Sequence, residues 1–245
     1  AAFVKTVIVK SGSIEDTESR LDILQKNIPI FQDLVPKLAA ASPNSIFLVV
    51  SNPVDILSYL TYKYSGFEAR RVIGSGTVLD TSRFKSALSK RFDVDARNIH
   101  AYIIGEHGDS EIAAWGITKI AGMSIPEFCD TVSDRCELGF KETILNQVRS
   151  AAYEILNRKG YTNYAVALSV RRIVEAILGN EQSILTLSSL FDGEEGIKDV
   201  YLSMPCIVGS EGIRQILPIP LTPSELSDLQ HSASILKGLI QQAGL

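Results

Sequence analysis

The residue with the clearest capacity for chemistry is His107, one of three histidines in the 245-residue chain. It lies in the glycine-bracketed segment GEHG at 105–108, directly after the apolar residues Ile103 and Ile104. Loops that follow buried strands commonly carry functional side chains, and an imidazole titrates near neutral pH. This position therefore predicts a proton donor to a bound substrate. A histidine that only stabilises the turn is the alternative, and residues upstream favour the chemical role.

Asp80 and Arg83 are the candidates to act with that histidine. They follow the glycine-rich loop GSG at 74–76, in a helix predicted to begin near Thr77. Residues three apart share one helix face, and helix N-termini face ligands in α/β proteins. A carboxylate raises the pKa of a neighbouring imidazole, while a guanidinium binds a carboxylate through two parallel hydrogen bonds. A solvated surface ion pair is the alternative interpretation.

Asn52 follows a further element that is expected to position a functional group. The five apolar residues at 46–50 are typical of a strand buried on both faces of a parallel sheet. Pro53 suits the first position of a helix, and Asn52 is predicted to cap that helix. Capping does not exclude contact between Asn52 and a ligand at the carboxyl end of the strand.

Four segments carry a resemblance to a known family: SNPVDIL at 51–57, VIGSGTVLDTSRF at 72–84, AYIIGEHGD at 101–109 and KGYTNYA at 159–165. In this order and spacing they resemble the NAD-dependent L-lactate dehydrogenases, within the lactate/malate dehydrogenase family, over nearly the whole chain. The resemblance implies an α/β fold. A truncated doubly wound (Rossmann) dinucleotide-binding domain is expected at residues 1–75, followed by the family's α+β C-terminal domain, which binds substrate, at 76–245. The resemblance also implies a homotetramer that works in glycolysis in the cytoplasm.

The resemblance implies roles for the residues that match its motifs. His107 is the general acid/base, and Asp80 is its carboxylate partner. Arg83 holds the substrate carboxylate, and Arg20, on a mobile loop, polarises the substrate carbonyl. Thr162 lines the substrate pocket.

The cofactor implied by the same resemblance is NAD. Asn52 is expected to contact both the substrate and the nicotinamide ring. The residues expected beside the cofactor are Gly12, Val50, Ser51, Asn52 and Ser75.

The implied reaction is the transfer of a hydride between NADH and a small 2-oxo acid, which for pyruvate gives L-lactate. Protonated His107 supplies the proton, since an acid with a pKa near the working pH is efficient. Arg20 stabilises the developing oxyanion, most strongly once water is excluded. The polar segment at 11–19 suits a loop that closes over the substrate, and an ordinary exposed loop is the alternative.

Substrate choice in this family depends on a residue just before the loop arginine. That residue is glutamine in lactate dehydrogenases and arginine in malate dehydrogenases. The loop here looks slightly short, so the selecting position is Ile14 or Glu15, depending on the end from which it is counted. Ile14 favours an apolar substrate side chain, and Glu15 repels oxaloacetate. Both argue against malate, although dehydrogenases of the malate and 2-hydroxyisocaproate types remain alternatives.

The beginning of the chain departs from the family pattern. No Gly-x-Gly-x-x-Gly segment precedes Asn52, although a dinucleotide-binding fold opens with one between a strand and a helix. Residues 1–9 resemble the fourth strand of the family's cofactor domain. We therefore expect a fragment, a processed form or an incomplete sequence. An alternative from another functional class is a catalytically silent homologue that serves as an interaction domain, but retention of the motif residues favours the enzyme.

Lys85 and His100 suggest a regulatory site. Lactate dehydrogenases of bacteria that are activated by fructose 1,6-bisphosphate carry a basic residue and a histidine at these positions. Two cations can bind phosphate across a subunit interface. A surface lysine and a hydrogen-bonded histidine are the alternative.

The composition excludes several other classes. A net charge of −4 argues against nucleic acid as the main partner. No apolar run reaches the roughly 18 residues of a membrane-spanning helix, so no membrane partner is expected. The cysteines lack metal-ligand spacing, and no metal site is predicted. Cys129, Cys136 and Cys206 are predicted to be free thiols in a reducing compartment.

Periodicity and turn residues predict the elements that must position these groups. A helix is expected over 18–40, interrupted by Pro29 and Pro36. Gly179 is expected to end a helix, and Thr222 to cap the last one. The other predicted elements are helices over 137–158, 162–178 and 223–242, and strands over 183–190, 200–208 and 213–217.

Overall fold

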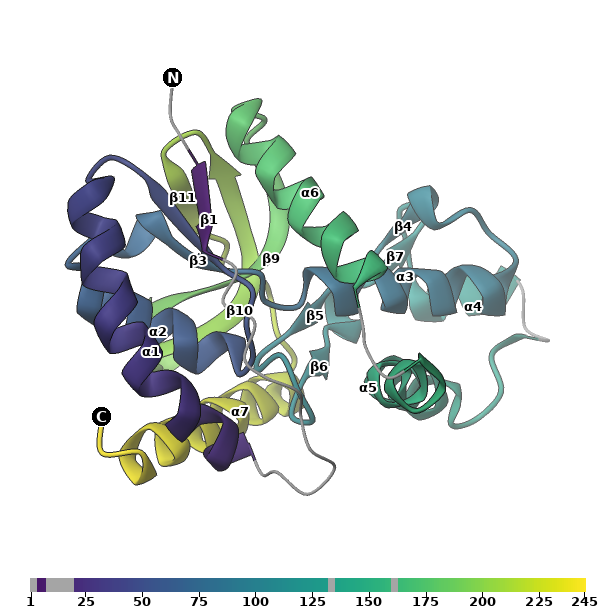
Figure 1. The fold of residues 1–245 in the computed structure, drawn as a ribbon. Coiled ribbons are helices and arrows are strands. Elements are labelled where there is room, and N and C mark those ends of the chain that lie inside the picture. The colour runs from purple at the N-terminus through teal and green to yellow at the C-terminus, as the bar shows by residue number, and fades with distance from the viewer. Residues whose placement is uncertain (1–3, 8–19, 132–134, 160–162) are drawn as a thin grey trace.

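The computed structural model describes residues 4–7, 20–131, 135–159 and 163–245 (Figure 1). Its frame is a six-stranded sheet in the spatial order β1-β2-β3-β9-β10-β11. The first three of these strands are parallel, and the last three are antiparallel to their neighbours. The strands are β1 (Val4–Val7), β2 (Ile46–Val49), β3 (Val72–Gly74), β9 (Ser183–Asp192), β10 (Lys198–Gly209) and β11 (Gly212–Ile216).

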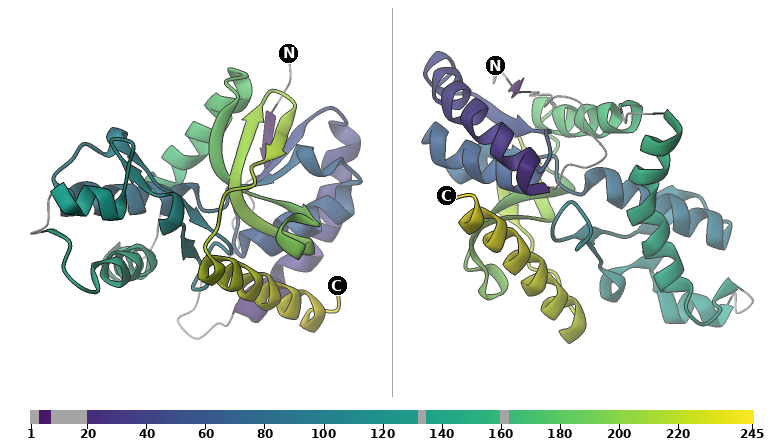
Figure 2. Two further views of the ribbon diagram at one scale, coloured as in Figure 1. Left: turned by 180° about the vertical axis from the view of Figure 1, so that it is seen from behind. Right: turned by 60° about the horizontal axis from the view of Figure 1, so that its bottom comes forward.

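Helices cover both faces of this sheet, because parallel strands must be buried on both sides. On one face lie α1 (Arg20–Ala41) and α2 (Val54–Ser65), with α7 (Pro223–Gln242) next to them; α6 (Tyr164–Leu178) covers the other face (Figures 1 and 2). Alternate residues of β2 belong to the two apolar clusters. Phe47 packs with the α1 and α2 side, and Leu48 packs with the α6 side.

A second group of elements lies beside the main sheet (Figure 1). Here α3 (Val78–Phe92), which follows β3, packs with α4 (Ile125–Thr131) and α5 (Phe140–Lys159) around a separate core. Phe92 of α3 makes edge-on ring contacts with Phe128 and Phe140. The short strands of this part are β4 (Ile99–His100), β5 (Ile103–Ile104), β6 (Ile112–Ala113), β7 (Lys119–Ile120) and β8 (Met123–Ser124).

The predicted bounds of the last helix are confirmed, and those of the three strands before it agree with the structure to within two residues. The helix α7 runs from Pro223 to Gln242, and the Thr222 hydroxyl accepts a hydrogen bond from the Glu225 backbone N–H. The Glu225 carboxylate accepts in return from the Thr222 N–H, which completes a capping box. The helix α6 ends before Gly179, as expected.

Two predictions about helices were wrong, one about breaks within α1 and one about the cap of α2. The helix α1 runs through Pro29 and Pro36 without a break. Both prolines lie on the exposed side of α1, where water can satisfy the carbonyl groups that lose their N–H partners. Asn52 does not cap α2, because Pro53 takes the N-cap position in an extended conformation and accepts the first helical hydrogen bond, from Leu57.

The cysteine prediction was wrong for two of the three residues. Cys129, on α4, and Cys136 form a disulfide, with their Cα atoms 5.8 Å apart. Cys206 is a free thiol, as predicted, and it is buried in β10.

The proposed domain boundary after residue 75 lies between β3 and α3, and the main sheet takes strands from both sides of it. Within the described ranges, no helix combines the length and the apolar character needed to cross a membrane. The same ranges contain no group of three or more His, Cys, Asp or Glu side chains that could hold a metal ion.

Gly76 is required where the chain leaves β3, and its replacement by alanine is expected to destabilise the protein strongly. Its φ is +51°, and an added Cβ would lie 2.5 Å from the Ser188 backbone nitrogen. We expect Gly76→Ala to lower the free energy of unfolding by roughly 3 kcal/mol or more, which lowers Tm by about 6–12 °C. Gly66→Ala is the matched control, since Gly66 has φ +66° but nothing within 4 Å of an added Cβ. Equal losses of Tm in thermal denaturation of the two variants would contradict this account.

Candidate active site

His107 and Asp80 form a directly hydrogen-bonded pair. The distance between His107 Nδ1 and Asp80 Oδ2 is 2.6 Å. Asp80 comes from the first turn of α3, and His107 from the turn after β5, so two separate elements meet at this pair. A carboxylate at Nδ1 fixes the imidazole tautomer and leaves Nε2 to exchange a proton with a ligand.

The pair holds His107 in its protonated form. Burial by itself lowers the pKa of His107, but the charge and hydrogen bond of Asp80, with smaller contributions from Asp55 and Glu111, raise the pKa to about 9. Burial raises the pKa of Asp80, and the neighbouring charges of His107 and Arg83 reverse this effect, so that its pKa falls below its ordinary value. An imidazolium and a carboxylate therefore face each other at neutral pH.

Arg83 binds the second oxygen of the same carboxylate. Its Nη1 lies 3.0 Å from Asp80 Oδ1, which confirms that the i, i+3 spacing places both residues on one face of α3. The Arg83 side chain is 16% exposed. Asp80 thus lies between His107 and Arg83, and it orients both of them. Nη1 is committed to Asp80, so the other guanidinium N–H groups are the ones suited to binding a ligand carboxylate.

The turn that carries His107 is fixed by its backbone. Gly105 and Ser203 of β10 exchange two hydrogen bonds of 2.9 Å. The N–H of Glu106 donates to Ser232 Oγ of α7 at 2.8 Å, and the N–H of His107 donates to Asp55 Oδ2 of α2, also at 2.8 Å. Three consecutive N–H groups are therefore held by three different elements.

Val50, Ser51, Asn52 and Ser75, the described residues among those predicted to contact the cofactor, lie at one edge of the sheet. The register aligns the carboxyl ends of the three parallel strands, with Val7 opposite Val49 and Val49 opposite Gly74. Ser75 continues this alignment, since its N–H donates to the carbonyl of Val49 at 2.8 Å. Ligands of open α/β sheets bind at such an edge.

These residues are accessible enough to contact a nicotinamide ring. Val50, Ser51 and Ser75 are half-buried, and Asn52 is exposed. Val50 offers an apolar side chain, and Ser51, Asn52 and Ser75 offer polar groups, a mixture that suits a cofactor pocket. These residues fit the nicotinamide end of NAD, and among the described residues no glycine-rich turn fits its pyrophosphate.

Several predicted residues lie outside the described part of the chain. These are Gly12, the alternative selecting residues Ile14 and Glu15, and Thr162. Arg20 is the first residue of α1, and its side chain also lies outside the description.

Two buried carboxyl groups near His107 were not predicted as site residues. Asp55 lies in the SNPVDIL segment, and it is 2% exposed within an otherwise apolar helix turn. Glu111 is 3% exposed; burial, and then the charge of Asp80, raise its pKa to about 8 against the opposing charges of His107 and Arg149. A charged residue inside an apolar stretch was the available signal for Asp55. For Glu111 the sequence offered no such signal.

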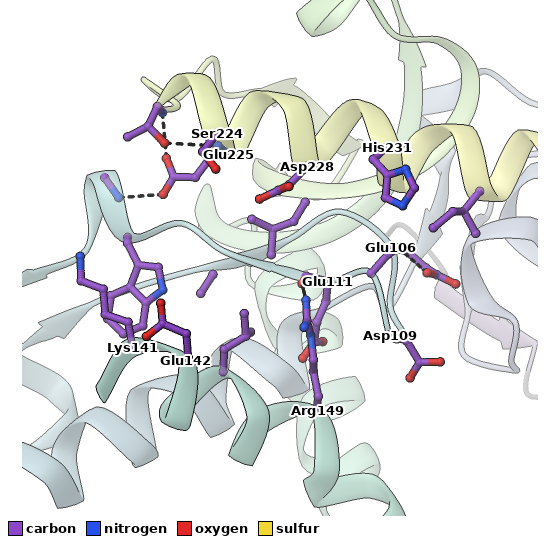
Figure 3. Close-up of a pocket in the computed structure, with 18 of the residues that line it drawn as sticks. Glu106, Asp109, Glu111, Lys141, Glu142, Arg149, Ser224, Glu225, Asp228 and His231 are labelled. Carbon is purple, nitrogen blue, oxygen red and sulfur yellow. Dashed lines mark hydrogen bonds between the residues drawn. The ribbon is translucent and has the colours of Figure 1, made fainter. Parts of the chain in front are cut away.

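A cavity of about 1000 Å³ lies away from the predicted catalytic residues, between the segment from Glu106 to Gly116, α5 and α7 (Figure 3). Arg149 of α5 reaches across it to donate a hydrogen bond of 2.5 Å to the Glu111 carbonyl. Ser224, Asp228 and other residues of α7 form the opposite wall. His107, Asp80 and Arg83 do not line this cavity, so it is distinct from the catalytic pair.

Lys85 and His100, the predicted regulatory residues, belong to neighbouring elements. Lys85 lies on α3, five residues after Asp80, and it is partly buried. Burial lowers the pKa of its ammonium group. Its Nζ lies 5.9 Å from the centre of the Tyr102 ring. His100 is exposed on β4.

Comparison with known proteins accounts for both halves of the chain. Residues 3–74 match the NAD binding domain of lactate/malate dehydrogenases, and residues 77–244 match the alpha/beta C-terminal domain of the same enzymes. An L-lactate dehydrogenase of Clostridium perfringens is 58% identical, over 100% of this chain and 83% of its own length. The minor L-lactate dehydrogenase of Enterococcus mundtii, in its ligands-bound form, superposes with a TM-score of 0.91 at 41% identity, over 97% of this chain and 76% of that one. A lactate dehydrogenase from a deep-sea metagenome library gives a TM-score of 0.93 at 36% identity, over 98% and 76% of the two chains.

The fold and the matched domains define an NAD-dependent oxidoreductase. NAD is its cofactor, and enzymes of this class act on lactate or malate. The chain belongs to the lactate/malate dehydrogenase family. The predicted α/β fold class, a doubly wound cofactor-binding domain followed by the C-terminal domain of this family, is thereby confirmed.

Proposed function

We propose that this chain is an L-lactate dehydrogenase that reduces pyruvate to L-lactate, with His107 as the general acid/base. The observation that carries the proposal is the 2.6 Å hydrogen bond between His107 and Asp80, together with a His107 pKa of about 9. A protonated imidazole with its Nδ1 occupied by a carboxylate is the form that donates a proton from Nε2. The relatives named L-lactate dehydrogenase support this choice of reaction.

NADH, when bound, supplies the hydride that reduces the carbonyl carbon of the substrate. Val50, Ser51, Asn52 and Ser75 are the residues proposed to hold its nicotinamide end, because they adjoin at the carboxyl edge of the parallel strands. Gly12 is assigned to the cofactor by the family resemblance alone.

Each protein side chain then has a defined task. His107 donates the Nε2 proton to the substrate oxygen as negative charge develops there. Arg83 holds the substrate carboxylate through the N–H groups that Asp80 leaves free. Arg20 is assigned to the carbonyl oxygen, where a guanidinium stabilises an oxyanion once water is excluded. Asn52 and Thr162 are assigned to the substrate pocket.

The test of the reaction is NADH oxidation by the purified protein with pyruvate, oxaloacetate and 2-oxoisocaproate supplied separately. We expect the highest kcat/KM with pyruvate. A preference for oxaloacetate would instead identify a malate-type enzyme, and a preference for 2-oxoisocaproate a 2-hydroxyisocaproate dehydrogenase. Absence of turnover with all three, in folded protein, would overturn the proposal and favour a catalytically silent interaction domain.

The pH dependence is expected to run in opposite directions for the two reaction directions. Pyruvate reduction needs protonated His107, so kcat/KM stays level at neutral pH and falls about tenfold per pH unit above pH 9. Lactate oxidation needs neutral His107, so its kcat/KM rises with pH up to that value. In Asp80→Asn, the charge that raises the pKa of His107 is lost while the burial that lowers it remains. The fall in kcat/KM for pyruvate reduction at alkaline pH should therefore begin at a lower pH. An unchanged limb in that variant would contradict the role of Asp80.

The finer family properties are also proposals. We propose that the chain forms a homotetramer, and that it works in glycolysis in the cytoplasm. We also propose that Lys85 and His100 bind fructose 1,6-bisphosphate. Support for the effector site is that Lys85 lies on α3 and His100 on β4, two elements that contact each other. Titration of kcat/KM with fructose 1,6-bisphosphate tests it, and a flat response would remove the effector site while leaving the reaction intact.

A further inference from the structure

Asp55 is a buried carboxylate with both oxygens engaged by the catalytic region. Its Oδ2 accepts the N–H of His107 at 2.8 Å, and its Oδ1 accepts the hydroxyl of Ser188 on β9 at 2.6 Å. Asp55 is 2% exposed, and Ser188 is fully buried. The carboxylate therefore links three elements, namely α2, β9 and the turn that carries His107.

Asp55 differs from the other groups that hold this turn. The N–H groups of Gly105 and Glu106 donate to a backbone carbonyl and to a serine hydroxyl, which are neutral. The N–H of His107 donates to a carboxylate, and a hydrogen bond to a charged acceptor is stronger than one to a neutral acceptor. The strongest of these three anchors is thus placed on the residue whose imidazole must be positioned.

The choice of a charged residue here is costly, because burial disfavours a carboxylate. Burial raises the pKa of Asp55 to about 6, the hydrogen bonds from Ser188 and His107 oppose that rise, and the charge of Glu106 adds to it. An asparagine could accept the His107 N–H and donate to Ser188 Oγ with the same shape. What an asparagine cannot supply is a negative charge beside the imidazolium of His107.

We propose that Asp55 is a positioning residue for proton transfer, which fixes His107 through its backbone and supports the charged imidazole through space. The inference rests on the proposed role of His107. Asp80 of α3 is hydrogen-bonded to the ring Nδ1 of His107, and Asp55 of α2 accepts a hydrogen bond from the backbone N–H of the same residue. The charged groups that face this region are Glu106 and Glu111 from the segment between β5 and β6, Arg83 from α3, and Arg149 from α5.

Asp55→Asn tests the charge with the shape retained. For pyruvate reduction by the full chain, we expect KM within about twofold of wild type and kcat lower by about tenfold, since one charged hydrogen bond is replaced by a neutral one. The alkaline limb of the pH profile should move to lower pH, because one negative charge that favours imidazolium is lost. A ¹⁵N NMR titration of the His107 ring should give the same displacement.

Ser188→Ala tests the same link from β9. Removal of its hydroxyl takes away a hydrogen bond that lowers the pKa of Asp55, so the pKa of Asp55 should rise. If ionised Asp55 is required, the acid limb of kcat, near pH 6 in the wild type, should move towards neutral pH. Ser189→Ala is the matched control, because Ser189 is the next buried serine of β9 and its hydroxyl faces Cys206. Both limbs should be unchanged in the control.

The outcomes separate this inference from the proposed function. If Asp55→Asn keeps the wild-type kcat and both pH limbs while His107→Gln is inactive, Asp55 has no positioning role and the acid/base assignment stands. If His107→Gln is fully active, the proposed function fails whatever Asp55 does. Asp55→Ala should lower kcat by about 100-fold. Should that variant not fold, Asp55→Asn and Ser188→Ala still decide the question.

Discussion

His107→Gln is expected to lower kcat for pyruvate reduction by about 10²–10⁴-fold, the contribution of a positioned general acid. Glutamine has a similar length, and its amide N–H can donate to Asp80 Oδ2 in place of Nδ1. It has no group that can transfer a proton at neutral pH. The loss should therefore appear in the chemical step, while the fold and the affinity for NADH are retained.

The matched control for this variant is His231→Gln, since His231 is an exposed histidine of α7 that lines the cavity away from the catalytic pair. Stopped-flow measurement of NADH oxidation separates the chemical step from product release, and thermal denaturation verifies the fold. If His107→Gln retained the wild-type rate, the proton donor would have to be another group, and the pH profile expected from a pKa of about 9 would lose its basis.

Arg83→Lys is expected to raise KM for pyruvate by about 10- to 100-fold, with a smaller fall in kcat. The guanidinium can bind Asp80 with Nη1 and a substrate carboxylate with its other N–H groups at the same time. An ammonium group has one nitrogen, so it cannot form the planar, two-bonded contact while it also neutralises Asp80. Loss of one charged hydrogen bond, at roughly 1.5–3 kcal/mol, gives this change in affinity.

Arg91→Lys provides the same substitution near the other end of α3. Arg91 donates to the Arg135 carbonyl and faces Glu137, away from the His107 pair. Its KM for pyruvate should equal that of the wild type. Equal values of KM in the wild type and in Arg83→Lys would show that another residue holds the substrate carboxylate.

Local sequence patterns sufficed for those parts of the site that lie within one element. The pair Asp80 and Arg83 was predictable because residues three apart on a helix are neighbours, and the ion pair on α3 follows directly. The strand before Val50 was predictable from an unbroken apolar run, since only burial on both faces explains it. Similarly, Thr222 and Glu225 have the spacing of a capping box.

Contacts between distant elements could not be derived in this way. Asp55 and Ser188 are 133 positions apart, and they meet only because β9 lies next to β3 in the sheet. The pairing of Cys129 with Cys136 depends on the distance between their Cα atoms, which their spacing in the sequence does not determine. For the pairing of His107 with Asp80, the family resemblance supplied what the residue pattern left open, since 27 positions separate them.

The hydrogen bond from Glu106 to Ser232 joins residues 126 positions apart, and it has a consequence for synthesis of the chain. Ser232 lies in the middle of α7, the last helix, and it is fully buried against the turn that holds His107. A ribosome must therefore deliver every residue up to Ser232 before that turn can be anchored on all sides. Premature termination anywhere ahead of residue 232 leaves Glu106 without this acceptor, so a nascent or prematurely ended chain lacks a fully assembled catalytic turn even when all of its motif residues have been translated.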